Sequence, residues 1–116
     1  MTEDYILIDR RPPAPPEAEL CLVADSDDME PYIRPGDRVY VSCHGSLGEM
    51  EAGLFLVRGQ VLCRQWCEDY SGTLHLLCAN PRRQERNLSF PPERRGDCVY
   101  LGKLLLPGPL PRPVYQ

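Results

Sequence analysis

The chain of 116 residues has the length of a single domain, and its 42% apolar and 26% charged residues are typical of a globular protein. Its 13 basic and 17 acidic side chains give a formal net charge of −4, which argues against a basic face that binds nucleic acid. The sequence contains neither a run of 18 apolar residues nor a basic-then-apolar leader, so we expect a cytoplasmic protein with no membrane partner.

Proline divides the chain into three parts. The run "EDYILID" near the start is apolar enough to add a strand, and "RRPPAPPEA" follows it. Because proline fixes φ and lacks a backbone donor, this second stretch is predicted to be an extended connector, as is "PGPLPRPVYQ" at the other end. We therefore predict an N-terminal strand and connector over residues 1–16, a main domain over residues 17–106 and a proline-rich tail over residues 107–116.

Short alternating runs, broken by turn residues, predict an all-β main domain. Arg58 and Gly59 lie between two apolar arms and predict a two-residue hairpin with positive φ at Gly59. A single helical turn near Asp28–Ile33 is the only helical structure we expect, since preceding acidic and serine side chains could cap it. The six predicted strands are Ala18–Ala24, Arg38–Ser42, Gly53–Val57, Gln60–Trp66, Thr73–Cys78 and Cys98–Leu106.

Six cysteines allow three interpretations: reduced core side chains, metal ligands or disulfides. No C-x-x-C pair occurs, and the closest pair, Cys63 and Cys67, has a spacing of four. Cys21 and Cys98 lie in apolar strand-like runs, where a thiol behaves as a small hydrophobe. His75 is typical of an exposed strand face rather than of a ligand. We favour reduced core cysteines and expect no cofactor and no metal.

Four segments carry a family resemblance: "AELCLVADSDDMEPYI", "RPGDRVYVS", a hairpin ending in "VLCRQW", and "LHLLCANP". Together, over about residues 18–106, they resemble the peptidase domain of LexA-like repressors and their signal-peptidase-fold relatives. The resemblance implies a compact antiparallel β-barrel or sandwich. The alternative is an unrelated small β-barrel that shares the pattern by coincidence. The matching residues are Met29, Glu30, Pro31, Gly36, Asp37, Asn80 and Pro81.

The chemistry implied by this resemblance is a serine–lysine dyad, in which neutral lysine takes the serine proton and backbone N–H groups hold the oxyanion. The serine position, directly before Met29, is Asp28 here, and the lysine position on the second hairpin arm is Arg64. Arginine does not deprotonate at accessible pH, so it cannot serve as the base. An aspartate that attacked a peptide bond would form an anhydride more reactive than the amide.

No catalytic residue is therefore assigned, and Ser26, Asp27, Met29 and Pro31 remain candidate site residues of the degenerate turn. Because Asp28 and Arg64 have opposite charges, we predict that they face each other in an ion pair. The alternative is that Arg64 points to solvent while Asp28 caps a turn.

An atypical peptidase site is the second hypothesis for function. Ser26 lies two residues before the serine position, and Lys103 is the only lysine. A two-residue shift within a turn moves and reverses a side chain, so Ser26 is better interpreted as a turn or cap residue. The only Ala-Gly pair, of the kind that LexA-like proteins cleave, is Ala52–Gly53, downstream at the start of a predicted strand.

The leading hypothesis is a catalytically inactive LexA-like domain for dimerisation or protein interaction, within a bacterial or phage-type transcriptional regulator. DNA contact would then need a helix-turn-helix module that these 116 residues do not contain, and whether the chain is part of a longer regulator stays open. A peptide-binding module that uses the former substrate groove is a further alternative. Candidate interface residues, with plain core as the other interpretation, are Trp66, Leu101, Leu104, Leu105 and Leu106.

Overall fold

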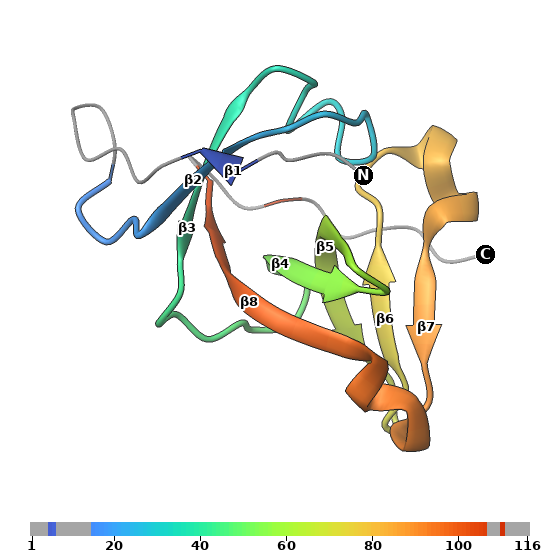
Figure 1. Cartoon of the computed structure of the whole chain (residues 1–116). Helices are drawn as coiled ribbons and strands as arrows, with labels where there is room; N and C mark the ends of the chain where they lie inside the picture. The colour runs from blue at the N-terminus through green and yellow to red at the C-terminus, as the bar shows by residue number, and fades with distance from the viewer. Residues whose placement is uncertain (1–4, 7–14, 107–109, 111–116) are drawn as a thin grey trace.

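A computed structural model describes residues 5–6, 15–106 and 110, and the predicted connector and tail lie largely outside them. The described chain is mainly β, with strands in the order β1-β2-β3-β8-β4-β5-β6-β7 and every neighbouring pair antiparallel (Figure 1). The strands are β1 (Tyr5–Ile6), β2 (Leu20–Val23), β3 (Arg38–Ser42), β4 (Ala52–Val57), β5 (Gln60–Glu68), β6 (Leu74–Leu77), β7 (Leu88–Phe90) and β8 (Cys98–Leu105).

The predicted all-β fold is confirmed, and within the described residues the sheet is curved but not closed, because β1 and β7 remain its two edges. The long strand β8 joins its two parts (Figure 1). The end of β8 pairs with β3, and most of its length pairs with β4. A register shift between Leu54 and Phe55 marks the place where β4 and β8 bend together.

Two apolar clusters form the core, one in each part of the sheet. The first lies under β2, β3 and β8 and contains Leu22, Met29, Ile33, Val39, Val41, Ala52, Leu54 and Leu104. The second lies between β4 and β7 and contains Phe55, Val57, Leu74, Leu76 and Phe90. Met29 and Ile33 belong to a turn rather than to a strand, so the first core fixes that turn against the sheet.

Each of the six predicted strands is present within two residues at either end. The hairpin between β4 and β5 has the predicted positive φ at Gly59, and Arg58 also has positive φ, as a two-residue turn matching the strand twist requires. The turn before β3 is likewise present, with Gly36 at a φ of 94° and Asp37 N donating to Arg34 O.

The helical structure differs from the prediction. Residues 28–32 form successive turns, although Met29 O does accept hydrogen bonds from the N–H groups of Tyr32 and Ile33. Two short 3₁₀ helices lie elsewhere, η1 (Pro81–Arg86) and η2 (Pro92–Asp97), with β7 between them. Both begin at proline, whose fixed φ suits the first helical position, and both are too short for an apolar periodicity to reveal them.

The six cysteines occupy several environments. Cys21, Cys67 and Cys78 are buried, as predicted for core side chains, whereas Cys43 is exposed. Burial raises the pKa of the Cys78 thiol to about 11, so this side chain remains protonated at neutral pH. Within the described residues, no helix combines the length and the apolar character needed to cross a membrane.

The predicted interface residues are mainly packing residues. Leu104 is buried in the first core cluster, which agrees with the alternative interpretation as plain core, because its side chain points inward from β8. Leu101 and Leu106 are half-buried against the same cluster, and Trp66 packs against the second. Leu105 is partly exposed.

Candidate functional site

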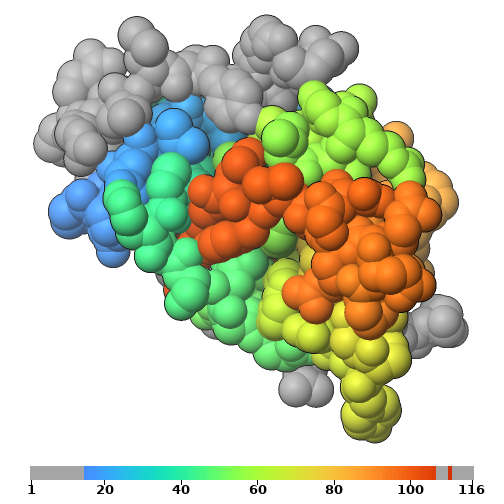
Figure 2. Space-filling model, turned by 60° about the horizontal axis from the view of Figure 1, so that its bottom comes forward, coloured from blue at the N-terminus to red at the C-terminus, as the bar shows by residue number. Residues whose placement is uncertain are grey.

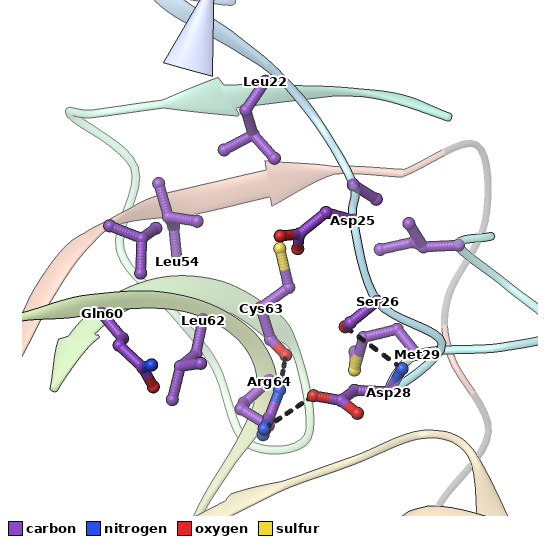
Figure 3. A pocket seen from close by; sticks show the side chains of 13 residues that line it. Leu22, Asp25, Ser26, Asp28, Met29, Leu54, Gln60, Leu62, Cys63 and Arg64 are labelled. Carbon is purple, nitrogen blue, oxygen red and sulfur yellow. Dashed lines mark hydrogen bonds and ion pairs between the residues drawn. The ribbon is translucent and has the colours of Figure 1, made fainter. Parts of the chain in front are cut away.

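A pocket lies between the turn after β2 and the first half of β5 (Figure 3). Its cavity volume is about 160 Å³. Eight of the thirteen lining residues are apolar, and Ser26, Asp28 and Arg64 lie together where the turn meets β5 (Figure 3). The lining residues are Leu22, Ala24, Asp25, Ser26, Asp28, Met29, Ile33, Leu54, Gln60, Val61, Leu62, Cys63 and Arg64.

Asp28 and Arg64 form the predicted ion pair in the wall of this pocket. Arg64 Nη2 lies 2.9 Å from Asp28 Oδ2, and only 4% and 8% of the two side chains are exposed. Figure 3 shows the carboxylate pointing toward the guanidinium. The alternative, in which Arg64 points to solvent, is therefore wrong. Because both groups are desolvated, each depends on the other for charge compensation.

The ion pair extends to η1, which sequence reasoning did not anticipate. Arg86 Nη1 lies 2.6 Å from Asp28 Oδ1, so the buried carboxylate binds two guanidinium groups. Arg83 binds the neighbouring Asp27 through both Nε and Nη2, at 3.0 and 2.8 Å. These hydrogen bonds from Arg83, together with the charges of Arg83 and Arg86, hold the pKa of Asp27 below its usual value. The acidic turn and the basic helix thus neutralise each other.

Asn80 connects the turn at Asp27 and Asp28 to the start of η1 through neutral hydrogen bonds. Its backbone N–H donates to Asp28 O at 3.0 Å, and its side-chain amide donates to Asp27 O at 2.7 Å. The amide oxygen accepts from Arg82 N and so caps η1. One asparagine therefore starts the helix and orients the turn that carries the ion pair.

Two donor groups near the ion pair, Arg64 Nε and the Ser26 hydroxyl, donate no hydrogen bond to another described residue. Arg64 Nε is buried and has no hydrogen-bond partner among the described residues. The one hydrogen bond recorded for the Ser26 hydroxyl is as an acceptor from Asp28 N, at a long 3.4 Å. A buried donor without an acceptor costs about 1–3 kcal/mol. This part of the wall is therefore suited to an acceptor from outside the chain.

The two sides of β5 have different strand neighbours beside the pocket. Residues Gln60–Gln65 pair with β4 on one side, while β6 pairs only with residues Gln65–Glu68 on the other. Among the described residues, no strand pairs with that second side of Gln60, Val61 and Leu62, and these three residues line the pocket. An open strand edge offers backbone groups to an extended chain.

Ser26 and Lys103, the two residues of the atypical peptidase hypothesis, have different surroundings. Ser26 lines the pocket, but Lys103 lies on β8 and its Nζ is 3.5 Å from Glu51 Oε1. Of the other predicted turn residues, Met29 is buried and accepts a hydrogen bond from Ala79 N through its sulfur, and Pro31 is exposed after a cis peptide bond.

Several site residues were not predicted from the sequence. Arg83 and Arg86 belong to the basic run "PRRQER", whose charge complements the acidic run "DSDD"; that complementarity was a usable signal. Asp25 and Cys63 gave no such signal, because only the folded geometry places them at the pocket.

Neither a scan against protein-family models nor a search of curated proteins found a match for this chain.

Proposed function

We propose that this chain is a non-catalytic protein-interaction domain of the LexA-like type, whose pocket holds an extended segment of another polypeptide without cleaving it. The observation that carries the proposal is the buried Asp28–Arg64 ion pair beside the first half of β5, where no described strand pairs with one side of Gln60–Leu62. It occupies the two positions at which the resemblance implies a nucleophile and a base.

The ion pair is a poor proton relay. Two guanidinium groups bind the Asp28 carboxylate, which lowers its tendency to attack an electrophile, and Arg64 stays protonated. The same contacts make the pocket wall rigid, which favours recognition by a preformed surface.

The bound segment would add a strand beside Gln60–Leu62, on the side with which no described strand pairs. Backbone groups of these three residues would supply hydrogen bonds, and the apolar lining residues would receive one side chain of the segment. A role in transcriptional control follows from the resemblance alone and is part of this proposal.

An array of immobilised extended decapeptides, probed with the purified chain, tests the proposal. We expect a subset of peptides to bind, and binding to fall at least tenfold in Ala24→Leu, which fills the pocket with extra apolar volume. The matched control is Val99→Leu on the exposed part of β8, which should bind as the unmodified chain does.

Intact-mass measurement of the chain and of bound peptides after alkaline incubation completes the test. We expect unchanged masses. Specific cleavage that Ser26→Ala abolishes would establish the atypical peptidase instead, and binding that is unaffected by Ala24→Leu would refute the pocket as the binding site.

Self-association is a second candidate, favoured by one observation. Val99 and Tyr100 are adjacent on β8 and are 48% and 40% exposed. Figure 2 shows the β8 and η2 region (orange) at the surface between the two parts of the sheet. Light scattering over a dilution series tests for a homodimer; a dimer that Val99→Asp dissociates would support this face, and a strict monomer would exclude it.

A further inference from the structure

We infer that the pocket selects the C-terminal end of a polypeptide, with a small apolar last residue in the cavity and its carboxylate at Arg64 and Ser26. This inference rests on the proposed function and specifies the ligand of the same site.

Donor geometry is the first reason. Arg64 Nε is a buried donor without an acceptor in the described part of the chain, and Arg64 lines the pocket. The hydroxyl hydrogen of Ser26, also in the lining, has no recorded acceptor, and Asp28 N makes only the 3.4 Å contact. A carboxylate offers about four lone-pair directions and can accept from all three donors. Nε is itself buried, so a ligand oxygen reaches it only when the adjoining wall moves, and the hydrogen bond then forms in a medium of low dielectric.

Charge is the second reason. Three guanidinium groups, from Arg64, Arg83 and Arg86, surround the two carboxylates of Asp27 and Asp28. Glu85 is 3.8 Å from Arg86 but 65% exposed, so its charge is largely screened. Asp25 is exposed and also lines the pocket; its negative charge opposes a second anion near it. Three guanidinium groups thus meet two carboxylates at the ion pair, whereas the wider cluster, which includes Asp25 and Glu85, has no surplus positive charge.

Shape is the third reason. A cavity of about 160 Å³ is close to the roughly 150 Å³ that holds benzene in an engineered apolar cavity, and it is well below the roughly 300–1,000 Å³ of drug-sized sites. One small side chain and its terminal group fill it. The wall made by Asp28 and Arg64 is buried and fastened to η1, so a chain that continued past it would have to break the ion pair. A chain end avoids that cost.

Matched pairs of N-acetylated hexapeptides ending in Ala, Val or Leu, each made as the free acid and as the amide, test the inference by fluorescence-polarisation titration. At neutral pH we expect at least one acid to bind about tenfold more tightly than its amide, because a hydrogen bond to a charged acceptor is stronger than one to a neutral acceptor.

Two variants locate the effect. Arg64→Met removes the guanidinium while Asp28 keeps Arg86 as its partner, and it should bring the ratio of acid to amide affinity close to one. Ser26→Ala removes the hydroxyl donor without touching the ion pair and should reduce the same ratio, which keeps the test valid if Arg64→Met does not fold. The matched control is Ser89→Ala on β7, which should leave the ratio unchanged.

The remaining outcomes decide between this inference and the proposed function. Equal binding of acids and amides, or binding of the immobilised decapeptides but of none of these hexapeptides, overturns the chain-end inference and leaves the peptide-binding function standing. Failure of every peptide in both experiments overturns both.

Discussion

Two pairs of an aspartate and a basic side chain have almost the same contact distance but different surroundings. Asp28 and Arg64 are 2.9 Å apart in the pocket wall, with 8% and 4% of their side chains exposed. Asp69 Oδ2 and His75 Nε2 are 2.8 Å apart at the end of β5 and β6, with 40% and 22% exposed. His75 Nδ1 also lies 2.8 Å from the hydroxyl of Ser89 across β6 and β7. Distance alone would rank these two clusters as equals.

The two clusters differ in how far their side chains are buried. Removing Asp28 leaves the buried Arg64 guanidinium without a carboxylate, whereas water replaces either partner of the second pair. The first cluster should therefore dominate stability and fix the shape of the pocket, and the second should make small contributions that depend on pH.

Of the substitutions considered, Asp28→Ala should lower the stability most. The unfolding free energy should fall by about 3–5 kcal/mol, because Arg64 loses its carboxylate while remaining buried. Arg64→Ala should cost less, since Asp28 keeps Arg86. Urea unfolding of both single variants and of the double variant measures the coupling between the two side chains; zero coupling would contradict the ion pair.

Gly102→Ala tests the strand that connects the two regions. A Cβ atom at Gly102 would lie 2.6 Å from Val41 Cγ1 and 2.8 Å from Ser42 O, so β3 and β8 would have to move apart. We expect a loss of about 1–3 kcal/mol in denaturant unfolding. Gly96→Ala is the matched control, because no atom lies within 4 Å of its added Cβ; equal losses in both variants would refute close packing at this junction.

Acid should weaken the exposed cluster through Asp69. Hydrogen bonds from Ser71 and His75 hold the pKa of Asp69 well below its usual range. A carboxyl whose folded pKa is depressed contributes stability above its unfolded pKa of about 3.9, and this contribution is lost as the pH falls below that value. Asp69→Asn should therefore flatten the fall of the unfolding free energy between about pH 5 and pH 2. Identical pH profiles for the two proteins would contradict the effect.

Ser89→Ala should have the smallest effect. It removes one cross-strand hydrogen bond to His75 at an exposed position, and such pairs contribute about 0.2–1 kcal/mol. Thermal unfolding at neutral pH measures this change. A loss as large as that of Asp28→Ala would show that burial does not rank the two clusters.

Local sequence patterns predicted much of the sheet and one contact of the site. Short apolar runs bounded by turn residues located β2, β3, β4, β5, β6 and β8. The opposite charges at Asp28 and Arg64 predicted their ion pair through the family resemblance. The strand β7 and the two 3₁₀ helices were missed, because β7 has only three residues and the helices, PRRQER and PERRGD, contain no apolar residue besides proline that could show a period.

By itself, the sequence determined which segments are strands and where the turns fall, because alternation, glycine and proline act on near neighbours in the chain. Only the tertiary structure decided that Arg83 and Arg86 reach Asp27 and Asp28 and that Leu104 is core. Those outcomes depend on segments more than 50 residues apart along the chain meeting at one place, as Arg86 and Asp28 do across 58 positions, and no local pattern encodes such a meeting.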